Sequence, residues 1–347
     1  MKDNMTPEAL DLNEPTNAVI CGFWKRVFAM ILDGILLGIV GAVIGMAAFD
    51  QLAQLGGGGR LIGFCIAVIY FGLFNSIIGK GQTPGKKMMK IHVVDHSGNH
   101  ISLAKSFLRY AILGLPFFLN GAIIPKSVIL SPVGYILSLL IFGFGAATIY
   151  LYVFNRRTRQ SLHDIAAGTF VTTAESSGKV VSSVWKPHLV VTGLLLVIAT
   201  ALPVAAKGLV KTWEFPELLT VQNSILSSGK VHNATAQAGK SWGTKNDEKW
   251  EKTYFQSVAI MKKRPDDFEA AGRDIARIIL SKYPKVLEKD TLTIIVTYGY
   301  DIGIASSWRR HNLSYTPEEW QGLLEKYKAE EKEHKSTHSI TASGGSE

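Results

Sequence analysis

One acidic residue stands inside a long apolar run near the amino terminus. The run begins at Gly22 and continues to about Phe49, longer than the roughly 20 residues that span a bilayer as a helix. Asp33 lies inside this run, about two helical turns after Arg26, so the two side chains share a helix face. An unpaired Asp at the centre of a membrane helix costs about 2.5–3.5 kcal/mol. We therefore expect Asp33 to face protein or a wet cavity.

A sheltered carboxylate of this kind has two interpretations. It can exchange a proton for a cation as the site alternates access, or it can fix the register of its helix by pairing with Arg26 or with a basic residue on another helix. Arg26 itself either reaches the lipid headgroups or pairs with Asp33 or Asp164. Asp164 follows a cluster of arginines, and it forms either a surface ion pair or part of the same coupled site.

Glycines follow the acidic residue at spacings that bring them to one side of the helix. Small residues separated by three others let a second helix approach closely, so the pattern predicts a helix–helix seam beside Asp33 and favours a homo-oligomer. The glycines assigned to this packing face are Gly34, Gly38, Gly41 and Gly45.

Other candidate sites are weak, and we expect neither an enzyme nor a cofactor. The segment Gly81–Lys87 lacks the spacing of a phosphate-binding loop. His92, His96 and His100 fall on an expected strand and turn, so they share no helix face that could hold a metal. The sequence has no Gly-x-Ser-x-Gly elbow, no His-Glu-x-x-His motif and no Cys–His cluster. We predict no catalytic and no metal-binding residue.

Apolar runs define the helices that must position these side chains. Hydrophobic residues make up 47% of the 347 residues and charged residues only 19%, below the roughly 25% typical of soluble domains. A short run that contains Pro116 is either a full span or a re-entrant segment. The pattern predicts about five transmembrane helices, at 22–49, 61–79, 110–124, 133–154 and 188–206.

Loop charges orient these helices. Most of the +9 net charge belongs to the first 207 residues, a placement that follows the positive-inside rule and argues against nucleic-acid binding. The polar residues 1–20 lack the basic start of a signal peptide. We expect a multi-pass bacterial inner-membrane protein with a cytoplasmic amino terminus and a periplasmic carboxyl-terminal domain. The residues assigned to the cytoplasmic basic surface are Lys86, Lys87, Arg156, Arg157 and Arg159.

Periodicities after Leu209 are those of a small α+β domain. A strand is expected at 254–261, a helix after Pro265, a hairpin over 292–308 and a charged helix from Thr316. In the membrane half, residues 90–101 are expected to form a local hairpin. We divide the chain into a polar amino terminus (1–20), a membrane domain (21–172), a cytoplasmic linker (173–187), a last transmembrane helix (188–207), a periplasmic α+β domain (208–335) and a disordered tail (336–347).

Three sequence blocks resemble the RDD family of integral membrane proteins over about residues 20–172. They are Gly22–Arg26 with Asp33, then Gly81–Lys87, then Arg156–Thr169. The resemblance implies a helical membrane bundle in which Arg26, Asp33 and Asp164 match the family's polar pattern. It also implies a link to cation/proton exchange or to transport of a ligand. The domain after Glu175 lies outside that pattern.

Two functions remain open. The first is transport of a small solute or cation coupled to protonation of Asp33. The second is a non-catalytic envelope scaffold whose outer domain binds a protein or cell-wall partner. In both, the lipid bilayer is a partner and nucleic acid is not.

Overall fold

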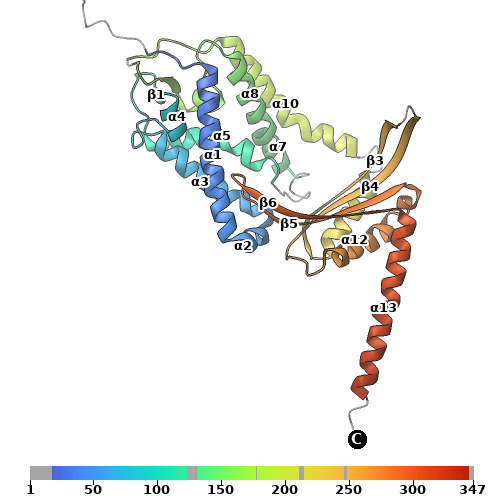
Figure 1. The fold of residues 1–347 in the computed structure, drawn as a ribbon. Coiled ribbons are helices and arrows are strands. Elements are labelled where there is room, and N and C mark those ends of the chain that lie inside the picture. The colour runs from blue at the N-terminus through green and yellow to red at the C-terminus, as the bar shows by residue number, and fades with distance from the viewer. Residues whose placement is uncertain are drawn as a thin grey trace, which may run out of the picture. The chain divides into compact units, whose positions relative to one another are not determined.

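The computed structural model describes residues 18–122, 128, 131–176, 178–210, 215–245 and 248–343. The chain divides into two compact units, and each is described by itself. The first unit holds 1–41, 60–122 and 126–203, and the second holds 42–59, 123–125 and 204–347. Figure 1 shows the course of the chain. Most of the predicted amino terminus, 1–20, lies outside the described residues.

Apolar helices dominate the first unit, which confirms the predicted helical membrane bundle. Within the described residues, four helices are long and apolar enough to cross a membrane: Phe23–Ala47, Gly56–Phe74, Val133–Phe154 and Lys186–Ala205. They comprise α1 (Phe23–Ala47), η1 (Gly56–Gly58) with α3 (Gly59–Phe74), α7 (Val133–Ser138) with η2 (Leu139–Gly143) and α8 (Phe144–Phe154), and most of α10 (Lys186–Val210). The fifth predicted span corresponds to α5 (Leu103–Leu119), a helix of 17 residues with Pro116 inside.

A small sheet joins two distant loops of this unit, and here the predicted local hairpin at 90–101 is wrong. Strand β1 (Ile91–Asp95) pairs antiparallel with β2 (Thr169–Thr173), so its partner lies beyond the end of α8. The segment before α1 lies along β2, because Cys21 N donates to Val171 O at 3.0 Å. Sequence periodicity recognised the strand, but it carries no information about so distant a partner.

Two short helices occupy the loops on either side of this sheet. Helix α4 (Pro84–Met88) begins at Thr83, whose side chain accepts from Lys86 N, and proline at its first position suits a helix start. Helix α9 (Leu162–Ala167) begins with a capping box between Ser161 and Asp164, and it ends at Gly168, whose φ of 61° suits glycine.

The second unit is an α+β domain built on a four-stranded sheet of order β3-β4-β5-β6. Its strands are β3 (Val231–Lys245), β4 (Glu248–Met261), β5 (Thr291–Asp301) and β6 (Ser306–Tyr315). Strands β4 and β5 run parallel and the other neighbours run antiparallel. The predicted strand at 254–261 lies within β4. The predicted hairpin over 292–308 is present as β5 and β6 but extends to Tyr315, and β3 was not predicted.

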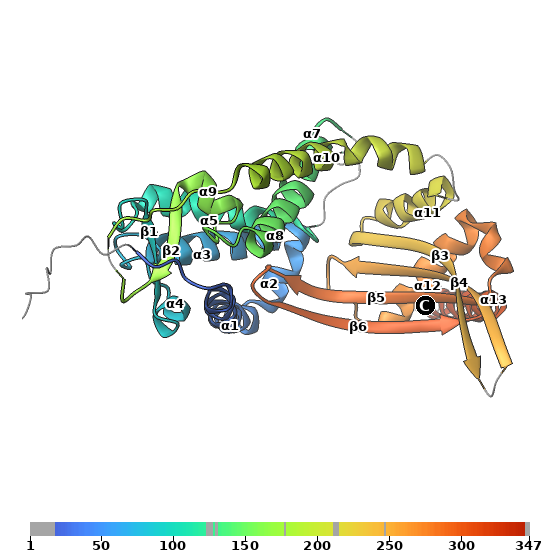
Figure 2. The same ribbon diagram turned by 90° about the horizontal axis from the view of Figure 1, so that it is seen from above.

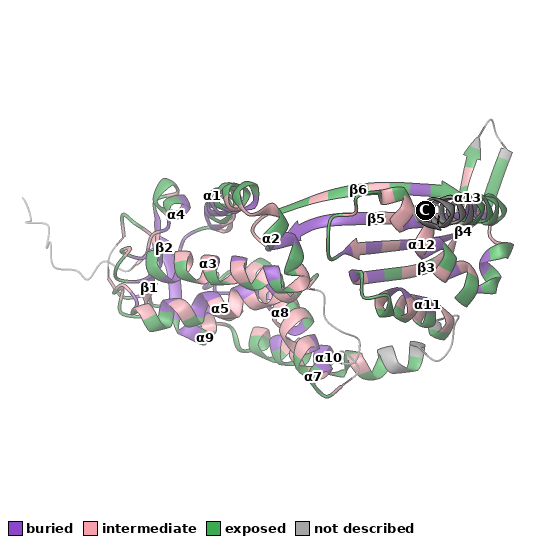
Figure 3. Cartoon of the chain, turned by 90° about the horizontal axis from the view of Figure 1, so that it is seen from below, coloured by how far each residue is buried: buried purple, intermediate pink, exposed green. Residues whose placement is uncertain are grey.

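Helices cover this sheet and complete its core. Helix α11 (Phe215–Ser227) packs on β3, and α12 (Phe268–Lys282) connects β4 to β5 and packs on β5 and β6 (Figure 2). Strand β5 is buried along most of its length, whereas β6 is largely exposed (Figure 3). Trp320 lies fully in this core, where its indole N–H donates to Leu292 O at 2.9 Å.

Three further helical segments belong to this unit. Helix α2 (Phe49–Gln54) packs on β5, and Tyr298 donates to its Asp50 at 2.8 Å. A 3-10 turn, η3 (Pro284–Glu288), follows α12. The last helix, α13 (Pro317–Ser343), continues past residue 336, where a disordered tail was expected.

Candidate functional site

Asp33 is buried in the first unit, as the sequence predicted. It is 1% exposed, and its carboxylate accepts three hydrogen bonds. Tyr70 donates its hydroxyl to Oδ1 at 2.8 Å, Thr83 donates to Oδ2 at 2.5 Å, and the backbone N–H of Gly85 donates to Oδ1 at 2.8 Å. These donors come from α3 and from the start of α4, so one carboxylate ties three helices together.

All three donors are uncharged. Among the described residues, no ion pair to Asp33 is present, so the interpretation in which Arg26 is its structural partner does not hold. A β-carbon at Gly85 would lie 2.8 Å from Asp33 Oδ1, so glycine is required for this close approach. The segment Gly81–Lys87 therefore holds the carboxylate through Thr83 and Gly85, a role that the sequence did not indicate. We call these two residues, together with Tyr70, the Asp33 cradle.

Lys86 lies beside this cradle. It was expected on the cytoplasmic basic surface, but it is partly buried, and its Nζ donates to Oδ1 of the buried Asn75 at 2.7 Å. Loss of hydration, together with the positive charge of Arg109, lowers the pKa of Lys86 to about 7, although Asp33 opposes the shift. The ammonium group therefore loses its proton more readily than that of an exposed lysine.

Asp164 is held by two guanidinium groups. Arg26 Nη2 donates to Oδ2 at 2.5 Å, while Arg109 donates to Oδ1 from Nε at 2.9 Å and from Nη2 at 2.6 Å. All three side chains are buried. Burial alone would raise the pKa of Asp164, but the charges of Arg109 and Arg26 outweigh it and hold that pKa well below its usual range. We call Arg26, Arg109 and Asp164 the arginine clamp.

Neighbouring groups fix the geometry of the arginine clamp. Arg26 also donates to the carbonyl oxygen of Arg159, a residue with a φ of 53°, which is unusual for a side chain with a β-carbon. The Arg26 guanidinium lies 5.0 Å from the ring centre of Tyr152. These contacts join the start of α1 to α8 and to the loop before α9.

His163 lies beside the arginine clamp and is neutral. Its Nε2 lies 3.2 Å from Arg109 Nη2 and its Nδ1 lies 2.8 Å from Ser161 Oγ. Since arginine only donates, Nε2 accepts and Nδ1 carries the proton. Burial, reinforced by the charges of Arg109 and Arg26, lowers the pKa of His163 to about 3.

The structure thus separates the polar positions that the sequence had grouped. Arg26 meets Asp164, and Asp33 has its own set of partners. Arg109 was not singled out, although it is an arginine at the start of an apolar run, the same signal that drew attention to Arg26. The partners Tyr70 and Asn75 carry no signal of their own in one sequence.

The remaining predicted residues are more exposed. Lys87, Arg156 and Arg157 are exposed, as the surface prediction required, and Arg159 is half-buried. Of the predicted glycine face, Gly34 has open space at its β-carbon position. Gly41 and Gly45 are buried, and Gly45 lies against the ring of Tyr300 on β5. Packing of this face against a second helix stays a prediction.

Comparison with known proteins covers the membrane half. Residues 20–168 match the RDD family. The chain is 25% identical over 158 residues to "Uncharacterized protein YckC" of Bacillus subtilis (strain 168), an alignment that covers 44% of this chain and 84% of that protein. Arg26, Asp33 and Asp164 all lie inside the matched segment. Residues 20–168 are thus an RDD-family domain with the apolar helices of a membrane protein, and the chain continues beyond it into a separate carboxyl-terminal region.

Proposed function

We propose that this protein exchanges a small cation or solute for protons across the bacterial inner membrane, with Asp33 as the point of binding and protonation. The observation that carries the proposal is a buried carboxylate whose three hydrogen-bond donors are all uncharged. A carboxylate held by neutral donors can gain or lose a proton without leaving a second buried charge unpaired. That freedom is what a coupled carrier needs.

The oxygen atoms around Asp33 suit a small cation. Hydroxyl groups can turn their lone pairs toward a bound ion, and hard cations prefer carboxylate, hydroxyl and amide oxygens. Tyr70 and Thr83 supply hydroxyl oxygens at the carboxylate, and Asn75 supplies an amide oxygen at the ammonium group of Lys86. In this mechanism the ammonium group of Lys86 occupies the site as a positive charge, and it becomes neutral when it loses a proton near pH 7.

The arginine clamp has a different part in the proposal. Asp164 stays ionised, and it holds α1, α5 and α9 together at one end of the site. We assign Arg26, Arg109 and Asp164 to the fixed frame against which the Asp33 cradle opens.

Chain connectivity supports the proposed orientation. The pairing of β1 with β2 and the bond from Arg109 to Asp164 bring residues 91–95, 109 and 164–173 to one side of the bundle. In this orientation the chain leaves that side through α5 and returns through α7 and α8. Because Arg109 lies on that side, only the ten residues from Tyr110 to Leu119 of α5 remain for the crossing, and they extend about 15 Å, about half of the hydrocarbon core. The charge of the loops therefore supports this crossing in the proposal. Five crossings then put the second unit outside, since basic loops stay inside.

Transport is tested on Asp33 with a carboxylate control. Asp33→Asn protein in liposomes should lose pH-driven cation flux while it keeps the elution volume of the wild type. Asp266→Asn removes an exposed carboxylate of the second unit and should leave flux unchanged. Wild-type flux from Asp33→Asn protein would refute the proposal.

Orientation is tested by labelling. In a chain with Cys21→Ser and Cys65→Ser, a single cysteine introduced as Trp242→Cys should react with a membrane-impermeant maleimide in intact cells. One introduced as Lys87→Cys should react only after the cells are opened. The reverse pattern would place the second unit in the cytoplasm.

The envelope scaffold remains a second candidate because of two exposed aromatic rings. Trp242 and Trp250, on neighbouring strands β3 and β4, are 76% and 40% exposed. Exposed tryptophans are common at the centres of binding surfaces. If the scaffold is the main function, Trp242→Ala with Trp250→Ala should reproduce the phenotype of deleting 209–347, and Asp33→Asn should not.

A further inference from the structure

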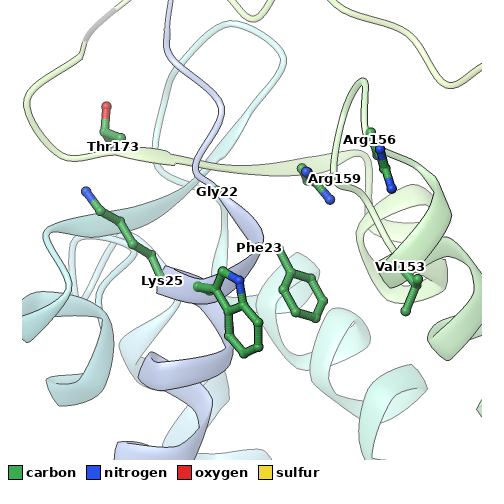
Figure 4. A pocket seen from close by; sticks show the side chains of 8 residues that line it. Gly22, Phe23, Lys25, Val153, Arg156, Arg159 and Thr173 are labelled. Atoms are coloured by element: carbon green, nitrogen blue, oxygen red, sulfur yellow. The ribbon is translucent and has the colours of Figure 1, made fainter.

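A pocket of about 550 Å³ lies at the start of α1, outside both the Asp33 cradle and the arginine clamp. This volume is within the usual range for small-molecule sites. Figure 4 shows its lining side chains around the first turn of α1. The pocket is lined by Gly22, Phe23, Trp24, Lys25, Val153, Arg156, Arg159 and Thr173.

The charge of this lining is entirely positive. Lys25, Arg156 and Arg159 carry cationic side chains, and the lining contains no carboxylate. Within the described part of the chain, none of these three side chains is engaged in an ion pair. The first N–H groups of α1 also lack intrahelical partners, and they add the positive end of the helix dipole. The positive charge of the pocket is therefore not neutralised by its lining, and this charge favours an anionic ligand.

The other lining residues are apolar, and they belong to the ends of membrane helices. Trp24 is the second residue of α1 and is 66% exposed, while Val153 is one residue from the end of α8 and is 44% exposed. Tryptophan at a helix end is typical of the headgroup region of a bilayer. A ligand here would meet cations on one side and lipid-facing apolar surface on the other.

We propose that this pocket binds the phosphate group of an anionic membrane lipid. Lys25, Arg156 and Arg159 surround the phosphate, and Trp24 and Val153 contact the start of the acyl chains. A free phosphate ion carries the same kind of charge, but it has no apolar group that could contact Trp24 and Val153. The proposal is independent of the transport proposal, because it involves neither Asp33 nor its hydrogen-bond partners.

The test measures binding of three probes to the full-length protein in an uncharged detergent. The probes are dioctanoyl phosphatidylglycerol, dioctanoyl phosphatidylcholine and inorganic phosphate. The pocket variant combines Lys25→Gln, Arg156→Gln and Arg159→Gln. The matched control removes three exposed lysines outside the pocket, as Lys87→Gln, Lys105→Gln and Lys179→Gln.

We expect phosphatidylglycerol to bind the wild type and the control alike. Each cation near an anionic lipid contributes about fivefold to affinity, so the pocket variant should bind it on the order of a hundredfold more weakly. Phosphatidylcholine and inorganic phosphate should bind weakly to all three proteins. Arg156→Gln alone removes one exposed side chain, and its expected loss of about fivefold provides a readout should the triple variant fail to fold.

Three results would overturn the proposal. Equal losses in the control and pocket variants would mean that diffuse surface charge attracts the lipid. Inorganic phosphate binding as tightly as phosphatidylglycerol would identify the ligand as a free anion. Unchanged phosphatidylglycerol binding in the pocket variants would show that the pocket holds no such lipid.

Discussion

Asp33 and Asp164 are both buried carboxylates of the RDD-family domain, yet their partners differ in charge. Asp33 accepts from two hydroxyl groups and one backbone N–H, whereas Asp164 accepts from two guanidinium groups. Positive partners fix a carboxylate as an anion over the whole physiological pH range. Uncharged donors also stabilise the anion through hydrogen bonds, but they bring no opposite charge that a change of the carboxylate would leave unpaired. The contrast is one of partner charge, and the proton-coupled step proposed above relies on it.

The largest effect on stability is expected from Asp164→Asn. The substitution leaves the buried guanidinium groups of Arg26 and Arg109 without their anion, and removing one partner of a buried pair typically costs about 3–5 kcal/mol. We expect a large fall in Tm, or loss of folded protein, measured by thermal unfolding in detergent. A Tm equal to that of the wild type would remove the distinction between the two carboxylates.

His163 should make the arginine clamp sensitive to acid. Its pKa of about 3 in the folded state lies below the ordinary value of 6.5, so between these values the unfolded chain binds more protons. Stability therefore falls as pH drops below about 6.5, by about 2 kcal/mol at pH 5. His163→Gln should flatten this part of the pH–stability curve, and an unchanged slope would argue against a neutral His163. The contribution of Asp164 has the same direction but is lost only as pH falls below its ordinary pKa of 3.8 toward its lower value in the folded state.

Lys86 should set the pH dependence of flux. The pKa of about 7 means that its positive charge is present below neutral pH and lost above it, so cation flux should rise as pH passes through 7. Lys86→Arg keeps the charge at all these values and should hold flux at its low-pH level. Lys86→Gln lacks the charge and should hold flux at its high-pH level. A midpoint near 7 in either variant would assign the titration to another group.

The smallest effect on stability is expected from Asp33→Asn. The amide oxygen still accepts from Tyr70 and Gly85, and the hydroxyl of Thr83 can accept from the new amide, so the loss should be about 1 kcal/mol. Thermal unfolding under the conditions used for Asp164→Asn measures the difference. A loss as large as that of Asp164→Asn would make Asp33 a structural carboxylate as well.

The sequence allowed the burial of Asp33 to be predicted because a lone acid in an apolar run has a high desolvation cost. It also allowed the hairpin after Asp290 and the helix after Pro265 to be predicted, because both depend on local periodicity and turn residues. The partners of Asp33 could not be predicted, since Tyr70 and Thr83 reach it from other segments. The same limit applies to Ile91–Asp95, whose strand partner begins at Thr169.

The position of Asp164 in the chain has a consequence for assembly. Arg26 and Arg109 precede Asp164 by 138 and 55 residues, so both guanidinium groups are synthesised before the anion that neutralises them. Once Asp164 and β2 have been synthesised, the arginine clamp can form its ion pairs and β2 can pair with β1, so all the contacts described at this site become possible. A chain that ended before Asp164 would have to bury both guanidinium groups without their anion, so we expect it not to reach this fold.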